Sequence, residues 1–386
     1  MQRVAKGRRA ASTDYPNPMT APPGYTGSLG GPDVTVRQLH VCVRMNEDIG
    51  VSDATLRGSA ATAPATALTS GIGAVPANIP GTASMSTSDW ALILFLAVLW
   101  GGSFFFSKVA VGDFPPLTVA LGRVGIAALV LHVLVRIRRE ALPATLKEWA
   151  PYVTMGLFNN VLPFGLIFWG QTHIGSGLAA TINATVPLFS ALIMHVVART
   201  PAERLNPRRS LGLVVGFIGV VVLIGPDVLG GIGSNALAQL AVVAAAISYG
   251  ISAAYSRRFY GTPPLRSATA QLTCSTALLL PVVVLTEHPW TIAAPSLAAW
   301  SSLLALGIFC TALGYLIFFR VLASAGALNL VLVTFLIPVT AMLLGTIFLD
   351  EVITSSTLLA MAIISLGLAI IDGRLWRRIR GVPRTA

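Results

Sequence analysis

Arg123 is the residue whose type and position point most clearly to chemistry, because it lies inside an otherwise apolar stretch of the chain. It comes about seven residues after Pro116, roughly 10 Å along a helix that rises about 1.5 Å per residue. A guanidinium at that depth in a bilayer costs a few kcal/mol unless it meets a partner, a cavity or the interface. Arg123 could therefore bind an anionic group such as a carboxylate. It could equally cap the carbonyl groups of neighbouring helices or extend its charge outward.

Three asparagines in apolar segments could form hydrogen bonds with a polar ligand. Asn159 and Asn160 come shortly before Pro163, whose ring removes an intrahelical hydrogen bond. Adjacent residues on a helix point about 100° apart, so at most one of this pair faces a given cavity squarely. Asn183 lies one turn before Pro187 and has a similar claim. All three could instead hold neighbouring helices together.

Four further residues near the middle of their apolar segments could line a polar cavity: Trp100, Ser103, Tyr249 and Tyr315. An aromatic ring with a polar atom suits such a wall, but each of these side chains could equally serve in packing. Three prolines are candidate hinges because each weakens its helix: Pro163, Pro187 and Pro338.

The sequence contains no pattern typical of a catalytic or metal site. Between Asp89 and Asp372 every carboxylate falls at or outside the end of an apolar segment. Cys42, Cys274 and Cys310 are far apart, with no CxxC and no metal-ligand spacing. An enzyme needs a convergent nucleophile, acid and base, or metal ligands. We therefore expect no catalytic residue, no metal and no cofactor.

Composition indicates which elements must position these side chains. Of the 386 residues, 54% are hydrophobic and 11% are charged, whereas soluble domains carry about 25% charged residues. Most of the surface must therefore face lipid, and we expect an integral membrane protein. The formal net charge of +11 does not indicate a nucleic-acid partner, because the basic residues form short clusters between segments of spanning length.

Ten apolar segments of about 20 residues follow residue 88, each long enough to cross a hydrocarbon core of roughly 30 Å as a helix. Helices are expected because the backbone in lipid must satisfy its own hydrogen bonds, and the sequence lacks the alternation of a barrel strand. The predicted spans are 89–111, 116–135, 150–172, 176–198, 210–226, 236–256, 267–286, 298–319, 325–349 and 355–373.

The two ends of the chain differ from this spanning region. Residues 1–87 are rich in Ala, Gly, Pro, Ser and Thr and are predicted to be disordered. Met85 leads directly into the first apolar segment, so an alternative hypothesis is that the protein starts there and that residues 1–84 are a wrongly assigned extension. Residues 374–386 are predicted to form a basic cytoplasmic tail.

The basic residues predict the orientation of the spans. Lys and Arg cluster after the second, fourth, sixth, eighth and tenth spans, and acidic residues predominate in the loops between. Because Lys and Arg accumulate on the cytoplasmic side, we expect both termini in the cytoplasm.

The spanning region contains an internal repeat with an offset near 148 residues. Each half holds five spans, and an odd number makes the second half inverted relative to the first. Residues 88–226 are the expected first repeat, and residues 234–373 are the second. Two inverted halves offer a route to alternating access around a midplane site. The matched pairs are Pro115 with Pro263, Gly102 with Gly250, and Arg123 with Gln271.

Several motifs carry a family resemblance. In the first half they are Trp100-Gly101-Gly102-Ser103, the Pro-Pro pair with Arg123, Ala179-Ala180 through Pro187, and Glu203-Arg204 with Gly212, Gly216 and Gly219. In the second half they are Ala325-Gly326 to Pro338, Asp350-Glu351 and Gly367. Together they resemble the two EamA-type repeats of the drug/metabolite transporter superfamily, over residues 88–373. The resemblance implies an all-α, ten-helix secondary carrier of small metabolites in the bacterial cytoplasmic membrane, often an exporter.

The substrate class is left partly open by the sequence. Arg123 favours a small metabolite that is amino-acid-like, or otherwise polar or anionic. The alternatives are a carrier for efflux of drugs or toxic compounds and a membrane enzyme of lipid metabolism. No span interior carries a carboxylate, so a proton-coupled mechanism lacks its usual group, and uncoupled transport or exchange stays open. The coupling ion, the direction and the oligomeric state are not predicted.

Overall fold

The computed structural model describes residues 85–198, 204–229 and 233–372. Its regular elements in these ranges are all helical, and ten helical segments are long and apolar enough to cross a membrane. The prediction of an all-α polytopic protein with ten spans is therefore confirmed. The expectations for residues 1–84 and for the basic tail lie outside the described residues.

The first half contains five spans, two of which are interrupted. The third span is α4, a π-helical segment η2 and α5, and the fourth is α6 followed by α7. The elements are α2 (Thr87–Ala110), α3 (Pro116–Arg138), α4 (Leu146–Gly156), η2 (Leu157–Val161), α5 (Leu162–Gln171), α6 (Ser176–Asn183), α7 (Val186–Val196) and α8 (Pro207–Leu229).

The second half has the same five-span order. Its third span is α11, a π-helical segment η6 and the start of α12, which then continues into the fourth span beyond a turn at Gly326. The elements are α9 (Ser234–Tyr255), η4 (Ser256–Phe259), α10 (Pro264–Thr286), η5 (Pro289–Thr291), α11 (Leu297–Ala305), η6 (Leu306–Leu313), α12 (Gly314–Leu349) and α13 (Ser355–Asp372).

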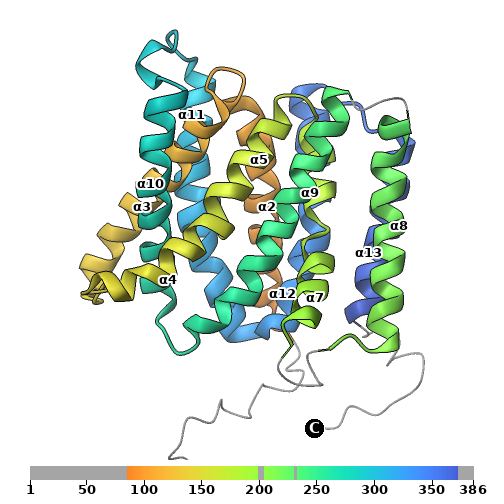
Figure 1. Cartoon of the computed structure of the whole chain (residues 1–386), viewed down its shortest axis with the longest axis horizontal. Helices are drawn as coiled ribbons and strands as arrows, with labels where there is room; N and C mark the ends of the chain where they lie inside the picture. The colour runs from red at the N-terminus through yellow and green to blue at the C-terminus, as the bar shows by residue number, and fades with distance from the viewer. Residues whose placement is uncertain (1–84, 199–203, 230–232, 373–386) are drawn as a thin grey trace, which may run out of the picture. The chain divides into compact units, whose positions relative to one another are not determined.

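Helix contacts between the halves come in matched pairs. The second spans of the two halves, α3 and α10, pack on each other, and so do the fifth spans, α8 and α13 (Figure 1). The first span of each half packs on the fourth span of the other half. These pairs are α2 with α12 and α9 with α7. Because successive spans alternate in direction and each half has five, equivalent helices run in opposite directions. The fold is that of two inverted repeats.

Several boundaries differ from the predicted spans, and two of these differences have a clear local cause. The third span begins at Leu146, four residues earlier than expected, because the Thr145 side chain caps the helix by accepting a hydrogen bond from the Glu148 N–H. The eighth span continues past Arg320 to Gly326, whose φ of 78° permits the sharp turn into the ninth span.

Glycine allows the close approach of α8 and α13. A Cβ on Gly367 would lie 2.5 Å from the backbone nitrogen of Gly216, which no side chain can occupy without a shift of the helices. Small residues allow such contact between helices in membranes, where tight packing replaces the hydrophobic effect as the driving force.

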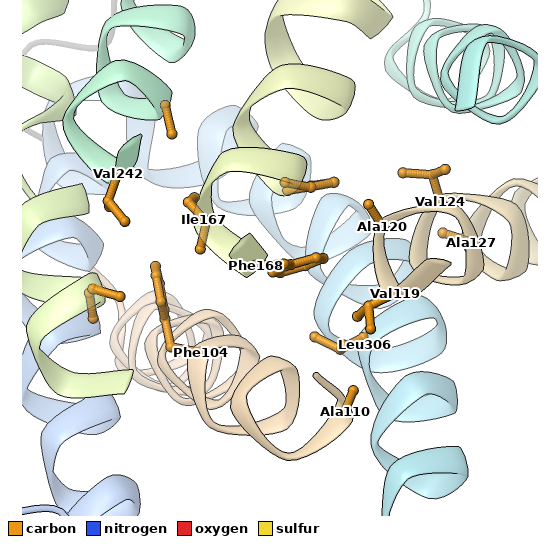
Figure 2. Close-up of a cluster of buried hydrophobic side chains, with 14 of the residues drawn as sticks. Phe104, Ala110, Val119, Ala120, Val124, Ala127, Ile167, Phe168, Val242 and Leu306 are labelled. Atoms are coloured by element: carbon orange, nitrogen blue, oxygen red, sulfur yellow. The ribbon is translucent and has the colours of Figure 1, made fainter. Parts of the chain in front are cut away.

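The largest group of buried apolar side chains joins both halves. Phe168 of α5 is 1% exposed and is directed toward α3, where Val119 and Ala120 lie (Figure 2). Leu306 of η6 and Val242 of α9 belong to the same group, although they come from the second half. The interior that surrounds Arg123 is therefore built by both repeats.

Loop carboxylates of the second half hold two helix N-termini of the first. Glu287 accepts hydrogen bonds from the N–H groups of Leu117 and Thr118 at 2.9 and 2.6 Å, at the start of α3. Glu351 accepts from the N–H of Ser176 at 2.6 Å, at the start of α6. Carboxylates stabilise helix N-termini by satisfying their unpaired N–H groups and by opposing the helix dipole.

Candidate substrate site

Arg123 of α3 is enclosed in the bundle, with 8% of its surface exposed. Its Nε donates a 2.9 Å hydrogen bond to the Thr311 hydroxyl oxygen. Its guanidinium carbon lies 4.0 Å from the centre of the Phe164 ring and 5.9 Å from that of Phe168. A cation over an aromatic face is stabilised by about 2 kcal/mol where water is excluded, which offsets part of the cost of burying the charge. The partners of Arg123 in the structure are a hydroxyl and two aromatic rings, and its role in binding an anion stays a prediction.

The two terminal nitrogens of Arg123 remain available for a ligand. Within the described residues neither Nη1 nor Nη2 donates a hydrogen bond, and Arg123 forms no salt bridge with a carboxylate. Neither nitrogen is among the fully enclosed side-chain atoms that lack a partner, so both keep some accessible surface. A guanidinium with both terminal nitrogens free can bind a carboxylate through two parallel hydrogen bonds.

A π-helical turn places the hydroxyl that orients Arg123. Thr311 lies in η6, and its hydroxyl donates a 2.8 Å hydrogen bond to the carbonyl of Leu306, five residues earlier. Because that proton is engaged, the hydroxyl oxygen presents a lone pair to Arg123 Nε. π-helical turns are rare and occur frequently at functional sites.

The first half has a π-helical turn at the corresponding place. The η2 segment begins 149 residues before η6, in the third span of its half. It carries Asn159 and Asn160. Both asparagines form a hydrogen bond with the Tyr315 hydroxyl, and which of them faces a substrate cavity stays a prediction.

Tyr315 is the centre of a polar network that joins the halves. Its hydroxyl oxygen accepts hydrogen bonds from Asn159 Nδ2 at 3.2 Å and from Gln271 Nε2 at 3.0 Å. The same hydroxyl donates to Asn160 Oδ1 at 3.4 Å. Gln271, the repeat equivalent of Arg123, thus binds the hydroxyl four residues beyond the one that Arg123 binds.

Two serines complete the network. Ser252 of α9 donates to Asn159 Oδ1 at 2.9 Å, and Asn160 Nδ2 donates to the hydroxyl oxygen of Ser275 on α10 at 2.9 Å. Both asparagines therefore join helices in this conformation. Whether either also binds substrate stays a prediction.

The aromatic candidates lie around these two groups. Tyr249 of α9 and Tyr315 both pack against the largest group of buried apolar side chains. The ring of Trp100 of α2 contacts that of Phe318 in a tilted arrangement with ring centres 5.6 Å apart, and its Nε1 lies against Gly314, next to Tyr315 in the chain. Ser103 of α2 is buried, with 6% of its surface exposed. The roles of Trp100, Ser103 and Tyr249 in binding stay predictions.

The hinge candidates differ in their surroundings. Pro163 follows directly on η2 at the start of α5. Pro187 follows an interruption of the fourth span at Ala184 and Thr185, between α6 and α7. Pro338 lies inside the continuous helix α12. Asn183 is the last residue of α6, and its Oδ1 is enclosed without a hydrogen-bond partner among the described residues.

A separate cavity of about 340 Å³ lies away from the predicted residues. It is lined by Gly177 and Leu178 of α6, Gln239 of α9, Met342 of α12 and the loop that carries Glu351. None of the candidate residues forms its wall.

The sequence did not single out several residues that hold the site together: Phe164, Ser252, Gln271, Ser275 and Thr311 as ligands of the candidate residues. The repeat offset identifies Gln271 as the equivalent of Arg123, and helical spacing places Ser275 one turn after it. No sequence signal marks Thr311, because its position depends on the π-helical turn. Among the described residues, no group of His, Cys, Asp and Glu could hold a metal ion.

Ten spanning helices in two inverted halves, with a polar interior between them, define a multi-pass membrane protein. The chain belongs to the EamA-like transporter family, whose sequence model matches residues 89–225 and 236–372. It is 27% identical over 282 residues to the uncharacterized transporter YoaV of Bacillus subtilis, covering 72% of this chain and 94% of the relative. It is 29% identical over 288 residues to the uncharacterized transporter YvbV of the same organism, covering 73% and 90%.

A solved protein crystal structure shares the fold. It aligns with a TM-score of 0.54 at 23% sequence identity, covering 76% of this chain and 99% of that chain.

Proposed function

We propose that this protein is a secondary carrier that moves a small anionic or amino-acid-like metabolite across the membrane by alternating access. The observation that carries the proposal is the state of Arg123: its guanidinium is enclosed, oriented by Thr311, and has two terminal nitrogens without a partner among the described residues. A buried charge is retained in a membrane span where it performs a function.

The surroundings of Arg123 favour a carboxylate over a cation. Among the described residues the one buried carboxylate is that of Asp89, at the start of the first span, and it is bound by Ser86 and Ser324. Lipophilic cations would therefore find no counter-charge near Arg123. The rings of Phe164, Tyr249 and Tyr315 add flat, partly polar walls that suit the organic part of a metabolite.

The two inverted halves supply the basis for alternating access. A pseudo-two-fold axis in the membrane plane lets the halves exchange conformations, which moves a central site from one side to the other. Arg123 and Gln271 are equivalent residues of the two halves, and they bind neighbouring hydroxyls of one helix. A rearrangement of that helix would alter both contacts together.

Direction and location rest on charge and resemblance. The basic clusters after the even-numbered spans favour cytoplasmic termini, as expected for a bacterial inner-membrane protein. We propose export as the direction, which is the common one in the family that the motifs resemble. Uptake of labelled substrate by inverted membrane vesicles, absent in right-side-out vesicles, would support export, and the reverse pattern would contradict it.

Binding is tested with the purified full chain by thermal unfolding in the presence of amino acids, organic acids, nucleosides and cationic drugs. A ligand that binds the native state raises the melting temperature. We expect anionic or zwitterionic metabolites to stabilise the wild type but not Arg123→Gln.

The matched control is Arg266→Gln, which removes an arginine at the end of α10 that pairs with Glu148 at 2.8 Å. It should respond to ligands as the wild type does. An equal response of wild type and Arg123→Gln would contradict the role of Arg123. Stabilisation by cationic drugs alone would favour the drug-efflux alternative.

A further inference from the structure

The fourth span contains a turn of backbone whose carbonyl groups have lost their usual donors. In a helix, each carbonyl accepts from the N–H four residues later. Pro187 has no N–H for the carbonyl of Asn183. The Thr185 N–H bonds to Ile182 instead of Thr181, and the Leu188 N–H bonds to Thr185 instead of Ala184. These three carbonyls, of Thr181, Asn183 and Ala184, therefore lack the N–H group four residues later that a continuous helix would supply.

The same turn contains a side-chain oxygen without a partner. Oδ1 of Asn183 is fully enclosed and accepts no hydrogen bond from the described residues. Asn183 as a whole is half-buried, whereas its neighbours are buried: Thr181 and Thr185 have no exposed surface, and Ala184 is 7% exposed. Oxygen atoms with no donor in an apolar interior are costly, so a ligand that satisfies several of them at once is strongly favoured.

The chemistry of this cluster selects a cation. The Asn183 Oδ1 and the three carbonyl oxygens are all acceptors, and they lie at the C-terminal end of α6, where the helix dipole places partial negative charge. Interrupted transmembrane helices of carriers commonly use such unwound carbonyls and half-helix ends to coordinate cations. The ligands are neutral, whereas divalent cations such as Ca²⁺ and Mg²⁺ are bound with the help of carboxylates.

We propose that the interruption between α6 and α7 binds a monovalent alkali cation, Na⁺ or K⁺, through Asn183 Oδ1 and the carbonyls of residues 181, 183 and 184. The site goes beyond the proposed function because it assigns a coupling ion. It gives the carrier an ion site that needs no carboxylate in a span interior. It also offsets the charge of an anionic substrate that enters the bundle.

The test measures the thermal unfolding of the purified full chain without substrate, in NaCl, KCl or choline chloride at equal ionic strength. Choline is too large for a cluster formed by one turn of helix. We expect Na⁺ or K⁺ to raise the melting temperature saturably by about 3 °C relative to choline. Equal melting temperatures in the three salts would overturn the proposal. Because no substrate is present, this outcome is independent of the Arg123 screen.

Two variants assign the effect to Asn183. Asn183→Leu should lose the ion-dependent rise, while the matched control Asn329→Leu, in the corresponding span of the second half, should keep it; Asn329 bonds to its own helix at Ala325. Asn183→Asp replaces a neutral ligand with a charged one and should lower the half-saturating ion concentration about tenfold. An ion-dependent rise that persists in Asn183→Leu, or an unchanged half-saturating concentration in Asn183→Asp, would overturn the assignment.

Discussion

Arg123 Nε and Thr311 Oγ1 are joined by a 2.9 Å hydrogen bond that crosses from the first half of the protein to the second. The bond engages Nε and leaves both terminal nitrogens without a hydrogen-bond partner among the described residues. A residue of one repeat is thus oriented by a residue of the other. A motion of the two halves relative to each other would therefore change the orientation of the Arg123 guanidinium.

Thr311→Val should weaken ligand binding without removing it. The valine has a similar shape but no acceptor for Nε, and the loss of one hydrogen bond to a charged group is worth about 1.5 kcal/mol, or roughly tenfold in dissociation constant. Thr311→Ser keeps the hydroxyl and should bind close to the wild type. Titration of the best ligand from the thermal screen measures the three constants. Equal affinity in all three proteins would show that Thr311 does not position Arg123.

Tyr315→Phe should lower the stability of the ligand-free protein. The change leaves the amide groups of Asn159 and Gln271 without their common acceptor, at a cost of about 1–3 kcal/mol for buried donors. The melting temperature of the purified variant measures the loss. Tyr260→Phe is the control because that side chain is 81% exposed and should leave the melting temperature unchanged. A Tyr315→Phe variant as stable as the wild type would mean that the network contributes little.

Gly367→Ala should destabilise the pairing of α8 and α13, although alanine is the better helix former. Its Cβ would lie 2.5 Å from the Gly216 nitrogen, and relieving such overlap costs about 1–3 kcal/mol. Gly225→Ala on α8 is the matched change, because a Cβ there meets no atom within 4 Å. It should be neutral or slightly stabilising through helix propensity. The measurement compares the melting temperatures of the two variants with that of the wild type. A Gly367→Ala variant as stable as the wild type would contradict the close approach of the helices.

We expect the stability of the protein to depend on pH through Asp113, in the loop between the first two spans. Hydrogen bonds from Ser296 hold the pKa of the Asp113 carboxyl below its usual value. A carboxyl with a lowered pKa in the folded state stabilises the protein above the unfolded pKa of about 3.9, and this contribution is lost as the pH falls through the folded value. Wild type should therefore lose more stability than Asp113→Asn on acidification from about pH 5 to pH 3. Parallel melting curves of the two proteins over that range would show that the carboxylate makes no such contribution.

The spans and the repeat could be predicted from the sequence because both depend on local properties. An apolar run of about 20 residues is sufficient to identify a span, and a fixed offset is sufficient to pair Arg123 with Gln271. The position of Arg123 within the second span follows from the same counting, whereas its burial in the bundle, with 8% of its surface exposed, is known only from the structure.

The detailed site could not be predicted, because it depends on departures from regular helix geometry. No residue pattern in the sequence predicts the π-helical turns that carry Asn160 and Thr311. The shared contact of Asn159 and Asn160 with Tyr315 could not be predicted either. The turn at Gly326 and the shifted backbone hydrogen bonds before Pro187 could likewise not be predicted from the sequence.

The central claim is that Arg123 binds the transported substrate, and counterflow in proteoliposomes tests it most directly. Vesicles that contain the full-length protein are loaded with the unlabelled ligand from the thermal screen, and uptake of the labelled ligand is followed with wild type, Arg123→Lys and Arg123→Gln. We predict saturable uptake by the wild type, reduced uptake by Arg123→Lys, which keeps the charge but not the paired donors, and uptake by Arg123→Gln no faster than by empty vesicles. Counterflow by Arg123→Gln at the wild-type rate and half-saturation would contradict the account.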